Sequence, residues 1–392
     1  MHLLHVADTH LGSSRPSGLR ERELDFYDVF DEVIEIAIKE GVDAVLHCGD
    51  LFDEPRPSPQ AYSYAVKSLK KLRDSGIDFL VIAGQHDQPK ISALSPIKVL
   101  EEVGLAKVLA TFKPETRVVR LRSGDLGITA VPYAEPQLMQ ELVKGVEKPD
   151  TGRKILMAHL LLKELNIPGA HLSLTELRSS YYDYVALGDY HARYETRHEG
   201  VPVIYPGSTE ALDYLESRDE RFVALVDLSR EEASVDWIKL SRFRKWLVIK
   251  SGTYSELIRR LRDISFSEFP KPPILHAEVS SAELVNADPK LVRDYMSKLT
   301  ENGKILTYAL ELPSISGEFD ETQYEEATPL PTLESVVHNL LKDPKISEHV
   351  LRIIKDYDDE SLIKTHIMRL IKDQELLSKL EKLVNRSDHP KR

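Results

Sequence analysis

The first half of the chain alternates short apolar runs with longer amphipathic stretches. The apolar runs predict buried strands at residues 3–6, 44–48, 79–83, 155–158 and 184–187. Between the early runs, residues 22–40 and 60–74 carry apolar positions three and four apart, which is the spacing of a helix with one buried face. Strands that alternate with helices predict a layered α/β core.

The second half begins with two further patterns. Residues 201–240 contain β-rich runs, such as 222–228, and predict strands that complete the core. Residues 246–312 follow the order strand, helix, strand, helix, strand, with elements expected at 246–250, 255–263, 274–279, 289–300 and 306–312. This order is enough for a small α+β domain of its own.

The C-terminal part changes composition again. Residues 314–331 contain Ser, Gly, Glu, Thr and Pro and read as a linker. Helical spacing follows at 333–342, 346–355 and 360–384, where the apolar faces either bind a partner or pack into a small bundle. We therefore expect four segments: a core at 1–240, an α+β domain at 241–313, the linker at 314–331 and a helical domain at 332–388.

Length and composition limit the class of protein. A chain of 392 residues suggests two or three domains, and 42% hydrophobic with 30% charged residues indicates a folded globular protein. No apolar run approaches the roughly 20 residues that cross a bilayer. Residues 1–6 form an apolar run without a basic leader, so we expect a cytoplasmic protein and no membrane partner.

Cysteine content and charge narrow the chemistry. Cys48 is the single cysteine, which excludes an intrachain disulfide and a thiolate metal site. Any metal must therefore use Asp, His and amide ligands. The net charge of −12 disfavours a simple nucleic-acid coat, whose affinity comes from Lys and Arg. It does not exclude DNA as a substrate, because bound metal ions offset the carboxylates that hold them.

Each of the five predicted strands of the first half runs into polar residues at its carboxyl end. These residues are Asp8 and His10; Asp50 and Asp53; Gln85, His86 and Asp87; His159; and Asp189 and His191. In open α/β sheets, sites form beyond the carboxyl ends of the strands, so these residues can converge. A carboxylate-rich set with imidazoles favours Mn among the common divalent metals, and a pair of such ions suits hydrolysis of a phosphate ester.

Three glycines precede these polar residues. Gly49, Gly84 and Gly188 stand where a strand must turn and let the backbone approach the site. A Cβ atom would obstruct that approach. His5 and His47 lie inside predicted strands, and we expect them in the core or in support of the site. Six other histidines lack ligand spacing, and we expect them at the surface or in helix packing: His171, His198, His276, His338, His349 and His366.

The five motifs resemble the calcineurin-like metallophosphoesterase superfamily, whose signature is D-x-H, G-D-x-x-D/H, G-N-H-D/E, H and G-H-x-H. Within it, residues 5–12, 49–59, 184–188 and 205–209 resemble the Mre-eleven family, called SbcD in bacteria, of DNA double-strand-break repair nucleases. The resemblance covers about residues 1–240. It implies a layered metallophosphoesterase β-sandwich flanked by helices, with a small α+β DNA-capping domain and a helical C-terminal tail.

The resemblance also implies a role for each motif residue. Two divalent metal ions, which we expect to be Mn, would be held by seven ligands: Asp8, His10 and His191 on the first ion, Asp50 bridging both, and Gln85, His159 and Asp189 on the second. His86 would be the catalytic histidine that steadies the phosphate and helps the leaving oxygen. Asp87 would orient it, and Asp53 would support the site without binding metal.

Two of these positions depart from the family pattern. Gln85 stands where Asn is usual, and Asp189 stands where His is usual. Both fall on the second ion, so the departures imply either a changed metal preference or loss of that ion. Arg15, Arg20 and Arg56 follow the motifs on loops, where they either contact DNA phosphates or are simply solvated.

The function implied is a 3′ to 5′ exonuclease and single-strand endonuclease of a nucleoid-associated repair complex. The partner implied is a coiled-coil ABC ATPase of the Rad-fifty or SbcC type, gripped by the C-terminal helices. Residues 60–72 and 95–103 would form a homodimer interface. Two alternatives stay open: a repair scaffold whose site no longer cleaves, and a metallophosphodiesterase of small substrates.

Overall fold

The computed structural model describes residues 1–90, 94–280, 289–311, 347 and 351. The described residues up to Glu311 belong to one compact unit, Met1–Ile315. The predicted linker and helical domain lie outside the described residues, apart from Ser347 and Leu351. No described helix has the length and apolar character needed to cross a membrane.

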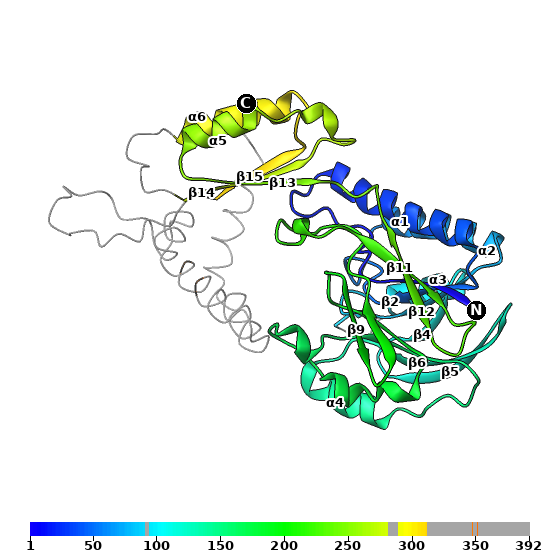
Figure 1. Cartoon of the computed structure of the whole chain (residues 1–392). Coiled ribbons are helices and arrows are strands. Elements are labelled where there is room, and N and C mark those ends of the chain that lie inside the picture. The colour runs from blue at the N-terminus through cyan, green and yellow to red at the C-terminus, as the bar shows by residue number, and fades with distance from the viewer. Residues whose placement is uncertain (91–93, 281–288, 312–346, 348–350, 352–392) are drawn as a thin grey trace, which may run out of the picture. The chain divides into compact units, whose positions relative to one another are not determined.

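The first sheet contains six strands in the order β12-β11-β1-β2-β3-β4 (Figure 1). Their bounds are β1 His2–Val6, β2 Ala44–Cys48, β3 Asp78–Ile82, β4 Lys107–Ala110, β11 Phe222–Asp227 and β12 Ser234–Lys239. Strands β1 to β4 are parallel, and β11 and β12 are antiparallel to their neighbours. The register places Leu4 opposite Val45 on one side and Leu225 on the other.

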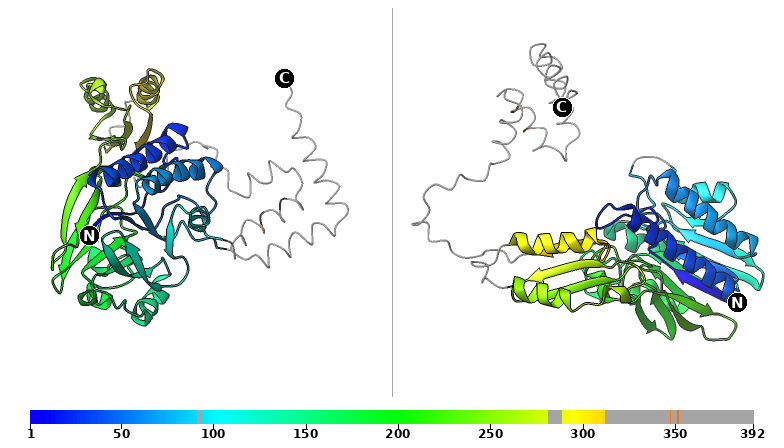
Figure 2. Two further views of the ribbon diagram at one scale, coloured as in Figure 1. Left: turned by 90° about the vertical axis from the view of Figure 1, so that its right-hand side faces the viewer. Right: turned by 90° about the horizontal axis from the view of Figure 1, so that it is seen from above.

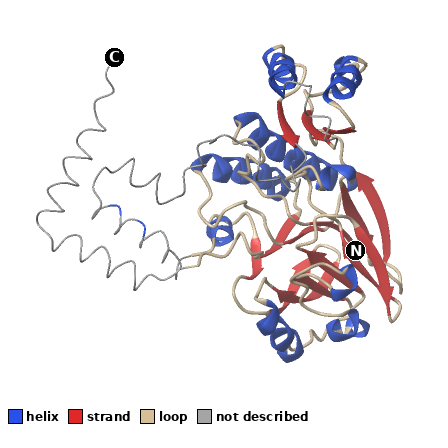
Figure 3. Ribbon diagram, turned by 90° about the vertical axis from the view of Figure 1, so that its left-hand side faces the viewer, coloured by secondary structure: helices blue, strands red, loops and turns tan. Residues whose placement is uncertain are grey.

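The second sheet also contains six strands, in the order β5-β6-β7-β8-β10-β9. Their bounds are β5 Glu115–Leu121, β6 Gly124–Val131, β7 Lys154–His159, β8 Tyr184–Gly188, β9 Tyr194–His198 and β10 Val201–Tyr205. Inward-facing apolar residues of the two sheets, such as Leu46, Leu80, Ile128 and Met157, form one buried cluster. The predicted β-sandwich is thus confirmed, with two layers of strands and helices on the outer faces (Figure 3).

Helices cover the outer face of each sheet. Helices α1 Arg20–Glu40, α2 Pro59–Asp74 and α3 Pro96–Glu102 pack on the first sheet, where Phe30 and Leu69 join Val45 in a buried cluster. Helices α1 and α2 lie side by side (Figure 2), with the rings of Tyr27 and Tyr64 stacked at 4.0 Å. Helix α4 Pro136–Gly145 covers the second sheet.

The α+β segment has the predicted order of elements. Strands β13 Trp246–Ser251, β14 Ile274–Val279 and β15 Thr307–Glu311 form a parallel sheet, and helices α5 Tyr254–Arg262 and α6 Pro289–Glu301 pack on it around Leu257, Leu275 and Met296. Short 3-10 turns complete the secondary structure: η1 Lys163–Leu165, η2 Leu174–Leu177, η3 Ser179–Tyr181, η4 Glu216–Arg218 and η5 Phe266–Glu268.

The predicted strands and helices of residues 1–103 are confirmed within two residues at each end. The hairpin of β5 and β6 and helix α4 are additions that the pattern did not predict. Strand β5 is mostly exposed, which leaves it without a strong apolar run. Tertiary pairing with β6 makes it a strand despite this weak local signal.

Candidate metal centre

The predicted site residues lie at the carboxyl ends of strands of both sheets or on the loops that follow them. Backbone hydrogen bonds join the loops: Asp8 N–H donates to the Gly49 oxygen at 3.0 Å, and His10 N–H donates to the Asp50 oxygen at 3.1 Å. In the second sheet, the Leu160 N–H donates to the Gly188 oxygen at 3.2 Å. The convergence predicted from strand ends is therefore present in the fold.

Four of these polar residues have left-handed backbone conformations. The φ angles are 53° at Asp8, 43° at His10, 53° at Asp50 and 91° at Asp189. Such conformations cost a non-glycine residue of the order of 1–3 kcal/mol, and they persist where the surrounding structure enforces them. Strain concentrated on four residues of one cluster is typical of a functional site.

The three glycines before the motifs make room for the same cluster. A Cβ atom on Gly49 would lie 2.2 Å from His159 Nδ1, and one on Gly84 would lie 2.2 Å from Asp50 Oδ1. A Cβ atom on Gly188 would lie 2.1 Å from the backbone oxygen of Cys48. The prediction that these glycines permit a close backbone approach is confirmed.

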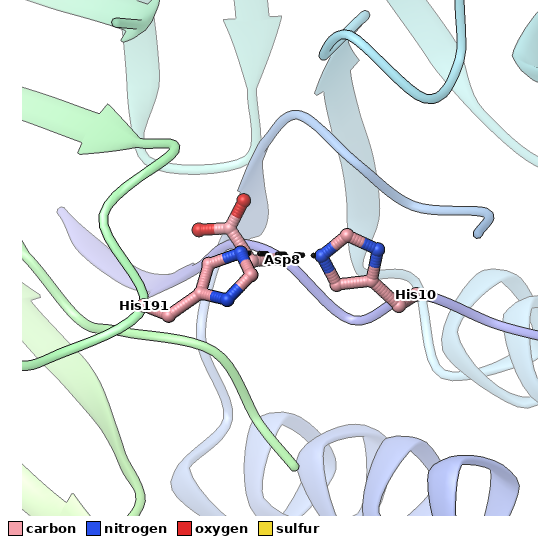
Figure 4. A group of neighbouring side chains, drawn as sticks. All are labelled: Asp8, His10 and His191. Atoms are coloured by element: carbon pink, nitrogen blue, oxygen red, sulfur yellow. Dashed lines mark hydrogen bonds between the residues drawn. The ribbon is translucent and has the colours of Figure 1, made fainter. Parts of the chain in front are cut away.

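A first group of ligand atoms comes from Asp8, His10 and His191, which lie within 4.8 Å of one another. Figure 4 shows the two imidazole rings facing each other beside the Asp8 carboxylate. Their Nε2 atoms are 3.3 Å apart. The Nδ1 of His191 faces away from the group and lies 2.7 Å from the Oε1 of Glu216.

A second group comes from Asp8, Asp50 and His159, so that Asp8 belongs to both. His159 is fully buried, and its Nδ1 donates to the Cys48 carbonyl at 2.8 Å. The Nε2 of His159 then faces the carboxylates, 3.5 Å from Asp50 Oδ2 and 3.8 Å from Asp189 Oδ1. Within the described residues this nitrogen has no hydrogen-bond partner.

The two ligand groups bring several ionisable side chains close together, which shifts their pKa values. Burial raises the pKa of Asp8 to about 7, and the charges of Asp50 and Asp189 act in the same direction, against His159 and His191. Burial alone would lower the pKa of His159, but the Asp50 and Asp189 carboxylates hold it well above its usual range. The cluster thus binds protons tightly wherever no other cation balances its carboxylates.

The donor set fits divalent metal ions. The ligand groups bring together two carboxylates, Asp8 and Asp50, and four imidazoles, His10, His86, His159 and His191, with Asp189 beside His159. The buried His159 Nε2 and Asp189 Oδ2 lack hydrogen-bond partners within the described part of the chain. A buried polar atom without a partner is costly, and coordination to a cation removes that cost. Oxygen and imidazole donors without thiolate suit Mn, Fe, Zn or Mg.

His86 lies at the edge of the first group. Its backbone N–H donates to Asp50 Oδ1 at 2.7 Å, and its ring packs edge-on against His10 with the ring centres 5.0 Å apart. The His86 Nδ1 is 2.6 Å from the backbone oxygen of Asp53, which makes Nδ1 the donor. This contact leaves Nε2 as the ring nitrogen available to a substrate.

The two supporting carboxylates have different surroundings. Asp53 Oδ1 lies 3.3 Å from His10 Nδ1 and 2.5 Å from Arg15 Nη2. Burial would raise the pKa of Asp53, but these two partners outweigh it and lower the pKa to about 2. Asp53 therefore carries a negative charge behind His10 at neutral pH.

Asp87 is fully buried and accepts backbone N–H groups from two loops. Its Oδ2 accepts from Leu51 and Gly84, and its Oδ1 accepts from Phe52, each at 3.1 Å. Burial raises the pKa of Asp87 to about 7, with the charge of Asp50 adding to the shift. Asp87 thus ties the loop after β2 to the loop after β3, while the Asp53 carbonyl is the partner of the His86 ring.

The two positions that depart from the family pattern lie differently. Asp189 is partly buried near His159, whereas Gln85 is exposed. The three arginines considered for phosphate binding, Arg15, Arg20 and Arg56, are also exposed. Of these three, Arg15 is paired with a motif residue, Asp53.

Sequence reasoning missed two residues around the site, Glu216 and His171, and it misplaced His276, which lies in β14 of the α+β segment. Glu216 contacts His191 from η4, which follows it by 25 residues with two strands between. His171 and His276 were predicted at the surface or in helix packing, and that prediction is wrong because they are 5% and 2% exposed. His171 packs edge-on against Tyr133, which packs in the same way against His159. No spacing rule signals these contacts, because each depends on how distant loops fold together.

Comparisons with known proteins agree with this geometry. Residues 1–231 match the calcineurin-like phosphoesterase superfamily domain, to which the chain belongs. The DNA double-strand break repair protein Mre11 of Sulfurisphaera tokodaii is 34% identical over 365 residues, which cover 90% of this chain and 92% of that relative. The protein of the same description from Sulfolobus acidocaldarius is 32% identical, covering 92% and 95%. The chain is a member of the Mre11 family.

The Mre11 family is also the one that the five strand-end motifs resemble. A third relative, the Mre11 protein of Saccharolobus solfataricus, is 30% identical over 92% of this chain and 96% of its own length. The similarity therefore extends beyond the phosphoesterase core that carries the motifs. The chain is a metal-dependent phosphodiesterase of this family.

Proposed function

We propose that this Mre11-family chain is a metal-dependent nuclease of DNA double-strand-break repair. It would act as a 3′ to 5′ exonuclease and as a single-strand endonuclease. The observation that carries the proposal is the pair of ligand groups that share Asp8, one with His10 and His191 and one with Asp50 and His159. Two cations on adjacent sites suit an in-line displacement at the phosphorus of a phosphodiester.

The proposed metal is Mn, with two ions per chain. Asp8, His10 and His191 would hold the first ion, and Asp50, whose carboxylate also lies within 4.8 Å of a His10 ring nitrogen, would bridge both. His159 and Asp189 would hold the second ion, supported by the 3.8 Å approach of Asp189 Oδ1 to His159 Nε2. Gln85 would complete the ligand set of the second ion by turning its amide inward from its exposed position.

The chain's own residues position and protonate the substrate. When bound, the two ions supply Lewis-acid stabilisation of negative charge on the phosphate. The Nδ1 of His86 donates to the Asp53 carbonyl at 2.6 Å, which leaves Nε2 as the ring nitrogen for the substrate. As the imidazolium, with its Nδ1–H held by the Asp53 carbonyl, His86 would donate the Nε2 proton to the 3′ oxygen that leaves and return to the neutral ring, a role worth about 10² to 10⁴ in rate.

DNA is the proposed substrate despite the net charge of −12. A shallow hollow of about 280 Å³ lies beside the loops after β2 and β3, lined by Glu54, Pro55, Arg56, Pro89 and Lys90. Arg56 and Lys90 supply two cations there for backbone phosphates. Arg15 on the loop after β1 and Arg20 at the start of α1 are exposed and are proposed as further phosphate contacts.

The partners proposed are a second copy of the chain and a coiled-coil ABC ATPase of the Rad-fifty or SbcC type. A homodimer through α2 and α3 is supported by apolar residues exposed beside α3, with Leu94 63% and Val103 52% exposed. The ATPase would bind the C-terminal helices, which lie outside the described residues. The α+β segment at 241–313 would cap the DNA. A nucleoid-associated place in the cytoplasm follows from this function.

A manganese-dependent nuclease assay on the purified chain tests the proposal. We expect cleavage of plasmid and oligonucleotide DNA with added Mn, and none with Asp8→Ala or in excess chelator. Equal cleavage in chelator would exclude the metal mechanism. Faster hydrolysis of a small chromogenic diester than of DNA would favour the small-substrate enzyme instead.

A repair scaffold is the second candidate, and the exposure of Gln85 favours it. A scaffold with a degraded second site would hold at most one ion per chain. Metal content measured at saturating Mn separates the two candidates, since the nuclease should hold two.

A further inference from the structure

A carboxylate stands behind the His191 ring, outside both ligand groups. Glu216 lies in the 3-10 turn η4, and its Oε1 is 2.7 Å from His191 Nδ1. The opposite ring nitrogen, Nε2, lies 3.3 Å from the Nε2 of His10. The imidazole of His191 is thus held between a carboxylate on one side and the first metal site on the other.

Several contacts fix the Glu216 carboxylate in place. Its Oε2 accepts the Leu212 N–H at 3.0 Å and lies 3.7 Å from Arg221 Nη2. Asp213 accepts the Glu216 N–H at 3.1 Å, which holds the start of the turn. Because both carboxylate oxygens are engaged, Glu216 has little freedom to rotate away from His191.

Arg221 joins Glu216 and His191 to the same support. Its guanidinium is 2% exposed and donates to the backbone oxygen of His191 at 2.9 Å and to that of Glu216 at 2.5 Å. The backbone positions of ligand and carboxylate are therefore set by one buried side chain. These two hydrogen bonds of Arg221 help to fix where the His191 ring, and with it Nε2, lies.

The contact between Glu216 and His191 has a consequence for metal binding, because the two nitrogens of an imidazole ring are coupled. A carboxylate that accepts the Nδ1 hydrogen fixes the ring orientation and leaves Nε2 to carry the ligating lone pair. We propose that Glu216 is a positioning residue for His191, which orients Nε2 toward the first ion and increases the affinity for it. The inference rests on the proposed function, since it assumes that His191 binds that ion.

Two substitutions separate positioning from general support of the fold. Glu216→Gln keeps the size of the side chain but removes its charge, so the neutral amide no longer enforces Nδ1–H. Glu216→Asp keeps the charge beside Arg221 and withdraws the carboxylate by one methylene from His191. The matched control is Glu220→Gln, which makes the same change at an exposed residue paired with Lys239.

The measurement is Mn binding to the full-length chain without DNA, followed by the electron paramagnetic resonance signal of free Mn. We expect two ions on the parent. Both Glu216 variants should bind one of the two ions about 10- to 100-fold more weakly than the parent does. This ion should be the one that His191→Ala removes. The ion that His159→Ala removes should keep its affinity, and Glu220→Gln should match the parent.

Nuclease activity adds a second readout. At low Mn the Glu216 variants should cleave slowly, and saturating Mn should restore their rate to within about threefold of the parent, because Glu216 acts through His191. Parental Mn affinity in both variants would overturn the inference, as would a rate loss that Mn does not rescue. If the parent bound Mn no more tightly than Asp8→Ala does, the proposed function itself would fail. That result concerns the parent alone and is therefore distinguishable from the outcomes for the Glu216 variants.

Discussion

Individual residues of the metal centre carry chemistry that their neighbours control. His86, His159 and His191 are all imidazoles, yet each has a different partner on Nδ1: the Asp53 carbonyl, the Cys48 carbonyl and the Glu216 carboxylate. In each case the partner fixes which nitrogen faces the cluster. The same side chain can therefore serve as an acid toward the substrate at one position and as a ligand at another.

The first prediction at this scale concerns His86. The variant His86→Ala should retain two Mn ions yet lose about 10²- to 10⁴-fold in cleavage rate, because it removes the proton donor and no ligand. Metal content and single-turnover cleavage of an oligonucleotide measure the two quantities. Loss of an ion from His86→Ala would make this histidine a ligand and contradict the assignment.

The second prediction concerns pH. Burial raises the pKa of Asp8 to about 7, and Glu216 with Asp8 raises that of His191 to about 9 against the effect of burial. Metal binding must displace these protons and that of His159, whose pKa is also raised, so Mn affinity should rise with pH from pH 6 to pH 9.

Each proton displaced makes the rise about tenfold per pH unit. Titration calorimetry in buffers of different ionisation enthalpy would measure the number of protons released. An affinity that did not change between pH 6 and pH 9 would show that the ligands are already deprotonated in the free protein.

At the scale of elements, polar contacts join the two sheets at their far end. Asp43 precedes β2 in the first sheet and accepts the His2 N–H at 2.8 Å. It also accepts from Arg122 Nε at 2.9 Å, a residue in the turn between β5 and β6 of the second sheet. Asp43 is 7% exposed, so it joins the start of β2 in the first sheet to the β5–β6 hairpin of the second from a buried position.

The third prediction follows from this link. Burial would raise the pKa of Asp43, but the His2 N–H and Arg122 outweigh it and lower the pKa below its usual value. As pH falls, the unfolded chain takes up the proton first, so the stabilising contribution is present above about pH 4 and is lost at lower pH.

Asp43→Asn should therefore lower the free energy of unfolding by about 1–3 kcal/mol at pH 7 and by less at pH 3. Urea unfolding at the two pH values measures the difference, with the exposed Asp150→Asn as the control. An equal loss at both pH values would mean that the Asp43 charge does not contribute.

At the scale of the whole molecule, the chain combines an acidic composition with a site for an anionic substrate. The net charge of −12 is a sum over the whole chain and includes the buried carboxylates of the metal centre. The ions that these carboxylates bind would neutralise them. The described core and α+β segment belong to one compact unit, Met1–Ile315. That unit contains all the proposed metal ligands.

The fourth prediction concerns the C-terminal part. Truncation after Pro331 should leave a folded, dimeric nuclease, because the metal ligands, α2 and α3 all precede it. The truncated chain should no longer bind the coiled-coil ATPase of the same genome. Light scattering after size exclusion and a binding assay with that ATPase test both parts. Full ATPase binding by the truncated chain would place the contact elsewhere.

The sequence by itself determined the strands that lead to the site and the residues at their ends. Burial on both faces makes β1, β2 and β8 apolar runs, and the polar motif residues follow within a few positions, as Asp8 follows Val6. The glycines were predictable for the same reason, since close backbone approach is a local requirement. Information of this kind lies within one element and its turn.

Only the tertiary structure decided the partners of those residues. Glu216 reaches His191 after the chain has passed through β9 and β10, and Asp87 accepts N–H groups from a loop more than 30 residues earlier. The pKa shifts of Asp8 and His159 likewise depend on charges brought together from four separate segments, which follow β1 and β2, end β7 and follow β8. Contacts between distant segments have no fixed sequence spacing, so the path of the backbone through both sheets determines them.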